Sequence, residues 1–503
     1  MKKLKAVEAT RKQYHQDPNV NSVHRSSLMV PEISGTAAEI SFLNHFLLKR
    51  NHKKIACIIT AINFDGKKIQ SQLQHIDEPR VYRFTLTGMV NQPVSNYLIE
   101  FYSVENLFFP YPAVMVNHVG NGFVNQVHSF NRVLNDIFED DEINAHQVNE
   151  SSVDLIINND IDTCLLFTAG PMKCKGPLNI EILTKDKTYK NTQQLDLSRF
   201  GIKKVSIKET FPDLQTGTAG VIKAMQPPQL LFYGRLLSGQ WTKNGAFSAN
   251  HTYYDSSTVE EYWDNSEPSS RFYPFFKELT NSVRLYPIMS PSELSIFITP
   301  TSSNGSLLDE IFVGKVKSPG NEFVNVNINK LLEKEGINYE KMNTYVVTAK
   351  TDSGKMPTRI GHQIVYGVGG LGTSINVVLN NPNIFVPEGR KSFKWGQTIV
   401  GGDFDTFVGI VADPSQYSEI KEQEFIVGFY DTTGKLTERK WKIPNGTAVS
   451  FSVETELRNE LVNLNNKNPE YIWCTIEGEK HGLNFFAISY NKLTKHCSGD
   501  HGF

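Results

Sequence analysis

The sequence has little of what would place the protein in several large functional classes. Cysteine is scarce, with five residues in 503, so disulfide bridges cannot form the framework of the fold. An excess of one charge is also lacking, because 51 Lys and Arg stand against 53 Asp and Glu and the net charge is −2. Without a basic field to neutralise phosphates, we expect no binding to nucleic acid.

Long apolar runs are lacking as well. No stretch of eighteen apolar residues occurs, so we expect no membrane-spanning helix. The basic segment at the start of the sequence contains no apolar core of a secretory signal. Cys57 and Cys474 lie in apolar segments that are typical of buried, reduced thiols. Together these features predict a cytoplasmic protein.

What the sequence does contain is a repeat of about 120 residues. Similar turns recur at Asp65-Gly66, Lys185-Asp186, Asn304-Gly305 and Thr433-Gly434, spaced by about 120, 119 and 129 residues. An alternating apolar strand follows each turn at a similar distance, at 82–86, 204–208, 323–328 and 448–453. A fixed period of this kind indicates one structural unit repeated along the chain.

The repeated unit reads as an antiparallel β-sandwich. Each period contains six or seven short strand patterns with frequent turn residues and no long amphipathic helix. We therefore predict an all-β protein of about four tandem modules, immunoglobulin-like or jelly-roll-like, with few short helices. The predicted boundaries are a basic N-terminal arm at 1–33 and modules at 34–159, 160–267, 268–388 and 389–503.

Two histidines occupy matching places in the first two modules. His128 and His251 lie 123 residues apart, each at the end of a predicted strand and before a run of acids, and the same step leads on to Ser374. One interpretation is a catalytic site of His128, His251, Asp255 and Glu261 between modules 1 and 2, joined by His118. Imidazoles and carboxylates would act there as acid and base or bind a divalent metal. The other interpretation is structural, with histidines that cap strand ends and acids that lie in solvent.

Aromatic residues cluster at the junction of modules 2 and 3. Tyr253, Tyr254, Tyr262 and Trp263 lie close together in the sequence among acidic residues. Exposed rings of this kind stack on sugars, and neighbouring polar groups bind hydroxyls. The alternative is that these rings pack the joint between the two modules.

The last residues form a third candidate site. His496 and His501 flank Cys497 and Asp500, and two such histidines can be metal ligands. A structural zinc site takes ligands from two separate elements, so a polar tail that folds back on module 4 is the alternative interpretation.

Three functions follow, and no catalytic signature separates them. The first is a non-catalytic binding or assembly protein, with a carbohydrate or another protein as its partner. The second is a carbohydrate-active or metal-assisted enzyme with its His and carboxylate site between modules 1 and 2. The third is a structural subunit of a particle or surface assembly. The ligand, the metal content and the oligomeric state stay open at this point.

Overall fold

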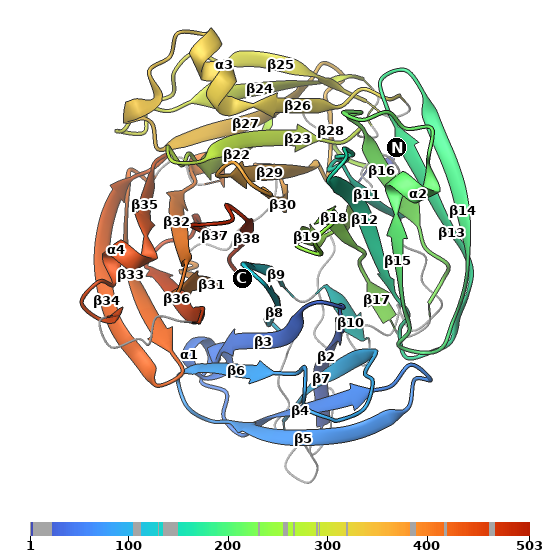
Figure 1. Ribbon diagram of the computed structural model, residues 1–503. Helices are drawn as coiled ribbons and strands as arrows, with labels where there is room; N and C mark the ends of the chain where they lie inside the picture. The colour runs from blue at the N-terminus through green and yellow to red at the C-terminus, as the bar shows by residue number, and fades with distance from the viewer. Residues whose placement is uncertain are drawn as a thin grey trace.

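The computed structural model is built almost entirely from strands. It describes residues 2–3, 23–103, 112–128, 130–133, 149–229, 232–254, 260–264, 267–287, 290, 292–317, 320–382, 389–416, 420–461 and 468–503. Strands account for 57% of the residues and helices for 6%, which confirms the predicted all-β class. The strands form four β-sandwiches that surround a common axis, each with an outer and an inner sheet (Figure 1).

Sandwich 1 has an outer sheet in the order β17-β10-β2-β7-β4-β5 and an inner sheet in the order β6-β3-β8-β9. Its strands are β2 (Val23–Pro31), β3 (Ala37–Leu43), β4 (Ile55–Ile62), β5 (Lys68–Ile76), β6 (Val81–Thr85), β7 (Asn96–Ser103), β8 (Met115–Gly120), β9 (Phe123–His128), β10 (Asn131–Val133) and β17 (Phe232–Gly234). Helix α1 (His45–Arg50) follows β3. Because β17 comes from the second repeat, this sheet links sandwich 1 to sandwich 2.

Sandwich 2 has the sheet orders β14-β13-β16-β11-β20 and β15-β12-β18-β19. Its elements are β11 (Asn149–Ser152), β12 (Ile161–Thr168), β13 (Cys174–Leu183), β14 (Thr188–Leu197), β15 (Ile202–Ser206), α2 (Ile207–Thr210), β16 (Val221–Met225), β18 (Leu237–Thr242), β19 (Phe247–His251) and β20 (Tyr253–Tyr254).

Sandwich 3 has the sheet orders β22-β27-β24-β25 and β26-β23-β29-β30. Its elements are β22 (Ser269–Pro274), β23 (Thr280–Leu285), β24 (Leu294–Pro300), β25 (Ile311–Val316), β26 (Val324–Asn327), α3 (Ile328–Lys334), η2 (Tyr339–Lys341), β27 (Thr344–Thr351), β29 (Gly361–Gly367) and β30 (Thr373–Val378). A separate small sheet joins β1 (Lys2–Lys3), β21 (Glu261–Asp264) and β28 (Lys355–Pro357).

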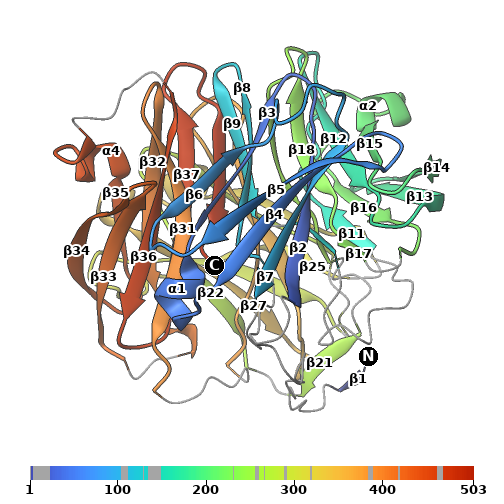
Figure 2. The same ribbon diagram turned by 90° about the horizontal axis from the view of Figure 1, so that it is seen from below.

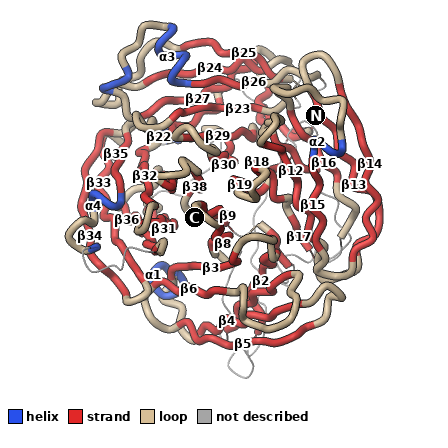
Figure 3. Tube along the Cα trace, in the orientation of Figure 1, coloured by secondary structure: helices blue, strands red, loops and turns tan. Residues whose placement is uncertain are grey.

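Sandwich 4 has the sheet orders β31-β36-β33-β34 and β35-β32-β37-β38. Its elements are β31 (Ser392–Val400), β32 (Phe404–Ala412), η3 (Pro414–Gln416), β33 (Glu422–Asp431), β34 (Gly434–Pro444), β35 (Ala448–Ser452), α4 (Val453–Glu456), β36 (Glu470–Gly478), β37 (Leu483–Asn491) and β38 (Cys497–His501). The helices α1 to α4 lie away from the axis (Figure 3).

The sequence repeat corresponds to one strand arrangement used four times. The predicted turns connect β4 to β5, β13 to β14, β24 to β25 and β33 to β34, the outermost strand pair of each sandwich. Gly66 and Gly305 adopt positive φ angles of 75° and 87°, which explains glycine in these turns. The alternating strands predicted at 82–86, 204–208, 323–328 and 448–453 correspond to β6, β15, β26 and β35, each an edge strand of an inner sheet.

The four sandwiches form a closed ring. Their innermost strands β9, β19, β30 and β38 lie side by side around the axis, and Figure 2 shows β8, β9 and β37 running along the height of the molecule. Sandwich 4 closes onto sandwich 1, where the Tyr471 hydroxyl lies 2.8 Å from Glu39 and the Trp473 indole nitrogen 2.7 Å from the Ser41 hydroxyl. The ends of the four innermost strands therefore meet at the centre.

Apolar packing runs across the borders between sandwiches. The core of sandwich 1 includes Trp241 and Phe247 of sandwich 2 and Trp473 of sandwich 4. Cys57 and Cys474 are buried and unbridged, as predicted. A shared core of this kind holds side chains of different repeats in fixed positions.

Candidate functional site

Polar residues from all four repeats converge where the innermost strands end. His128 and His251 are the last residues of β9 and β19, and their Nε2 atoms lie 3.0 Å apart. Asp500 of β38 contacts His128, and the side-chain amide of Asn376 on β30 donates to the carbonyl oxygen of His251. These four residues follow one another at intervals of 123, 125 and 124 positions. The repeat thus places one polar side chain from each sandwich at the centre.

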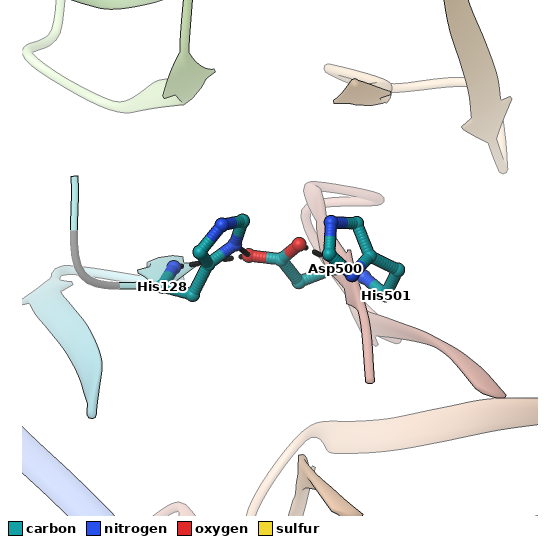
Figure 4. A group of neighbouring side chains, drawn as sticks. All are labelled: His128, Asp500 and His501. Carbon is teal, nitrogen blue, oxygen red and sulfur yellow. Dashed lines mark hydrogen bonds and ion pairs between the residues drawn. The ribbon is translucent and has the colours of Figure 1, made fainter. Parts of the chain in front are cut away.

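His128 is held by Asp500. Its Nδ1 lies 2.8 Å from Asp500 Oδ2, and its backbone N–H donates to the same oxygen at 3.0 Å (Figure 4). Burial acts to raise the pKa of Asp500, but the charge and hydrogen bonds of His128 outweigh it and hold that pKa below its ordinary value. Asp500 is therefore an ionised carboxylate at neutral pH.

The hydrogen bonds of His251 fix which of its two ring nitrogens carries the proton. His251 Nδ1 lies 2.7 Å from the carbonyl oxygen of Thr252, so this nitrogen must donate. Burial, with the charges of His128 and Arg235, holds the pKa of His251 well below its ordinary value, so its Nε2 is an acceptor. His128 Nε2 therefore donates to His251, and His128 Nδ1 lies against the buried Asp500 carboxylate.

His501 lies beside His128. Its ring centroid is 4.9 Å from that of His128, and its Nδ1 lies 2.9 Å from the carbonyl oxygen of Gly502. Burial lowers the pKa of His501 to about 4, against the opposing effect of Asp500. The ring is neutral at physiological pH, so Nδ1 donates and Nε2 is left with a lone pair.

A positively charged pocket of about 520 Å³ opens beside the histidines. Arg132 comes from β10 of sandwich 1, Arg235 from the segment between β17 and β18, and Lys394 from β31 of sandwich 4. Arg271 and Arg359 belong to sandwich 3. The full lining is His128, Phe130, Arg132, Tyr233, Arg235, Arg271, Arg359, Lys394, Asn484, Phe485, His501, Gly502 and Phe503. Every repeat contributes a cation, and no Asp or Glu is among these described lining residues.

Arg271 is fixed in place by β30 of its own sandwich and by β37 of sandwich 4. Its Nη1 donates to the carbonyl oxygen of Val378 at 3.0 Å and its Nη2 to Asn484 Oδ1 at 3.4 Å. The amide nitrogen of Asn484 donates in turn to Asp413 Oδ2 at 3.3 Å, which turns the Asn484 oxygen toward the guanidinium. Arg271 Nε is buried and has no hydrogen-bond partner among the described residues. The guanidinium therefore keeps donor capacity beside the pocket.

Lys394 is the one lysine among the lining residues. It is half-buried on β31, and within the described part of the chain its ammonium makes no hydrogen bond or ion pair. Burial, and then the positive charges of Arg271 and Arg390, lowers the pKa of Lys394 to about 8. The repulsion between Lys394 and these two arginines is costly unless an anion balances their charges.

His128, Asp500 and His501 also form the group with potential metal-ligand atoms, all within 4.8 Å of one another. Both nitrogens of His128 and Nδ1 of His501 are already engaged in hydrogen bonds. The neighbouring arginines and Lys394 would repel a divalent cation. These residues therefore fit an anion-binding role better than a metal centre.

The structure brings together two of the predicted catalytic residues, His128 and His251, and places a third, Glu261, in another sheet. His128 and His251 meet, whereas exposed Glu261 lies on β21 in a sheet that contains neither β9 nor β19. Asp255 lies outside the described residues. His118 is buried on β8 with its Nε2 2.9 Å from the carbonyl oxygen of Pro31.

Of the two predicted metal ligands, His501 lines the pocket. His496 precedes β38 and its Nε2 lies 2.7 Å from the carbonyl oxygen of Phe247, whereas His501 ends that strand, so the two are not brought together. Trp263 is half-buried and packs against the core of sandwich 3. Tyr253 and Tyr254 form β20, which pairs with β11.

The arginines and Lys394 were not predicted as site residues, although the repeat contains a signal for them. Arg359 lies 124 residues after Arg235, and each stands two positions before a β-strand of an inner sheet. Lys394 lies 123 residues after Arg271, and both are the third residue of their strand. Comparing basic residues in repeat register would have placed these four side chains near the axis.

Comparison with known proteins adds little. No family model and no curated protein matches the chain. One solved structure, the M60 catalytic domain with the CBM51-1 and CBM51-2 domains of ZmpB from Clostridium perfringens, aligns at 10% identity and a TM-score of 0.13. The alignment covers 98% of this chain and 55% of that one. A TM-score this low supports no conclusion about fold or function.

Within the described residues, no helix has the length and apolar character needed to cross a membrane.

Proposed function

We propose that the protein is a binding protein whose ligand is a small, multiply charged anion held in the central pocket. The observation that carries this proposal is the lining itself, with four arginines and one lysine drawn from all four repeats and no acidic residue among them. Arginine side chains bind carboxylate and phosphate oxygens in pairs of hydrogen bonds.

The size and the rings of the pocket define the ligand further. A cavity of about 520 Å³ accommodates a metabolite-sized molecule. Phe130, Tyr233, Phe485 and Phe503 add apolar surface to the lining. We therefore expect phosphate or carboxylate groups on a body with an apolar face, a description that includes an anionic saccharide.

This location differs from the aromatic cluster that suggested carbohydrate binding. Trp263 packs against a core, and Lys355 lies over the ring of Tyr262 at 5.0 Å from its centroid. These contacts favour a packing role for the two rings. A saccharide partner therefore fits the central pocket better, provided that it carries negative charge.

The test is isothermal titration calorimetry of the full chain with inorganic phosphate, citrate and glucose 6-phosphate, and with glucose as the neutral control. We expect at least one anion to bind, more weakly at high salt because screening reduces the attraction, and glucose not to bind. Phosphate and citrate separate the two ligand chemistries. Absence of binding by all three anions would contradict the proposal.

A pair of variants links binding to the pocket. Arg271→Gln removes one fixed charge and should weaken anion binding by about tenfold or more. Lys440→Gln removes an exposed charge from β34 at the rim of sandwich 4 and should leave affinity unchanged. Equal losses in both variants would indicate non-specific attraction, and glucose binding that persists in Arg271→Gln would favour a neutral saccharide site.

A further inference from the structure

We infer that Lys394 is a nucleophile of the central pocket and forms an imine with an anionic carbonyl compound, of which a 2-oxo acid is the simplest. This inference rests on the proposed anion binding, because the arginines would hold the acidic group of the compound. It adds a covalent step that anion binding alone does not require.

The position of Lys394 supports this role. Its side chain lines the pocket together with Arg271, Arg359 and His501, so a bound anion would lie against its amino group. A lysine that only balanced charge in the fold would face a carboxylate. Within the described residues, Lys394 has no such ion pair.

The repeats provide an internal comparison. Arg271 and Lys394 are both third in the first strand of their sandwich, 123 residues apart. An arginine at this place is permanently charged and binds anions, whereas a lysine can lose its proton and attack a carbonyl. The chain thus has a nucleophile at one of two equivalent positions around the pocket.

The surroundings of Lys394 also favour the uncharged, nucleophilic form of its amino group. Burial and the charges of Arg271 and Arg390 lower the pKa of Lys394 to about 8. With that pKa, roughly a tenth of the side chain is the free amine at pH 7. Lysine nucleophiles are activated in this way, by desolvation and a neighbouring cation.

The reaction is an addition followed by loss of water. The amine nitrogen forms a bond to the carbonyl carbon, and the π electron pair of the carbon–oxygen double bond moves to the oxygen. The nitrogen gives up two protons, and the carbonyl oxygen leaves as water with both of them. His501 is neutral and has an Nε2 lone pair, so it can carry one proton from nitrogen to oxygen. No oxidant or cofactor takes part.

Reductive trapping tests the inference directly. The full-length protein is incubated with glyoxylate, or with pyridoxal 5′-phosphate as a phosphate-bearing aldehyde, then reduced with sodium borohydride and mapped by mass spectrometry. We expect one adduct per chain, on Lys394, and protection by the anion that binds in calorimetry.

Lys49 is a matched control within the same chain. Burial and nearby charges lower its pKa to about 8 as well, but its ammonium bonds the carbonyl oxygen of Phe393 at 3.3 Å and lies over the Trp395 ring, and it does not line the pocket. We expect Lys394 to be modified about tenfold more than Lys49, because only Lys394 is near the bound anion. Equal modification of the two lysines would overturn the inference.

The variant Lys394→Arg separates this inference from the proposed function. It keeps the positive charge and removes the nucleophile, so anion binding should persist while the adduct is lost. If the wild-type protein binds anions but forms no adduct on Lys394, the imine inference fails alone. If it neither binds anions nor forms the adduct, the proposed function fails as well.

Discussion

The Nε2 atoms of His128 and His251 lie 3.0 Å apart although 123 residues separate them in the chain. The contact links two repeats, and the Asp500 carboxylate links His128 to a third. Since each hydrogen bond fixes the proton of the next, the three side chains form one unit. Substitutions in this unit should therefore not act independently.

Replacing Asp500 tests that dependence. Asp500→Asn removes a buried negative charge that contacts both the ring and the backbone N–H of His128, and we expect the free energy of unfolding to fall by about 3 kcal/mol. Urea unfolding at neutral pH, followed by fluorescence, measures the loss.

The double variant His128→Gln/Asp500→Asn is the control. If the two residues act as a pair, the double variant should lose less stability than the two single variants added together. Strict additivity would show that the contact between them contributes nothing.

Buried neutral histidines should make the protein sensitive to mild acid. Burial lowers the pKa of His45 and His362 to about 3 and that of His118, His496 and His501 to about 4. In the unfolded chain these groups titrate near pH 6.5, so below about that pH the unfolded state binds more protons. The free energy of unfolding should fall as the pH drops from there toward the folded pKa values, by up to about 1.4 kcal/mol per pH unit for each histidine.

Urea unfolding between about pH 7 and pH 5 measures this slope. The variant His496→Gln keeps a donor for the carbonyl oxygen of Phe247 but has no group that titrates. Its stability should depend less steeply on pH than that of the wild-type protein. An unchanged slope would mean that His496 is protonated in the folded state.

The sequence alone predicted the architecture because the repeat consists of turns and strands that depend on residues close together in the chain. The turns at Asp65-Gly66 and Asn304-Gly305 and the strands after them depend on neighbouring residues, and each was placed correctly. The pairing of His128 with His251 also followed from the repeat period.

The rest of the site depends on how the ring closes. Asp500 contacts His128, which lies 372 positions earlier in the chain, because sandwich 4 packs against sandwich 1 and closes the ring. The C-terminal pattern around Asp500 suggested a local metal site, and nothing near it in the sequence pointed to His128. The same holds for Arg132 and Lys394, which share a pocket only because four sandwiches surround one axis.

Removing the charge of Lys394 should stabilise the unliganded protein. Its folded pKa of about 8 lies below the value of an exposed lysine, so the charged form is disfavoured in the fold. We expect Lys394→Met to raise the free energy of unfolding at pH 7 by about 1 kcal/mol, since functional sites often reduce stability. The stability of the wild-type protein should rise above about pH 8 as its Lys394 loses the proton, so the difference should shrink there.

Thermal unfolding with and without the bound anion tests whether the stability gained in Lys394→Met is accompanied by weaker anion binding. The anion should raise the melting temperature of the wild-type protein more than that of Lys394→Met. A variant that is less stable than wild type at every pH would show that Lys394 is a packing residue.

The closure of the ring between sandwiches 4 and 1 depends on a buried hydroxyl. Tyr471 donates to Glu39 Oε2 at 2.8 Å, and Glu39 is only 7% exposed and is also paired with Arg83 at 3.0 Å. Tyr471→Phe keeps the ring packing but removes this donor, so we expect a loss of about 1 to 2 kcal/mol in the free energy of unfolding.

Tyr262→Phe is the matched control, because Tyr262 is only half-buried on β21 and the ring beneath Lys355 is retained. Its stability should stay within about 0.5 kcal/mol of wild type. If the two variants are equally stable in urea, the Tyr471 hydroxyl does not hold the ring closed. If Tyr471→Phe also lowers the dependence of unfolding on urea, sandwich 4 separates before the rest unfolds, and the pocket would be lost with it because His128 and Asp500 lie on opposite sides of that joint.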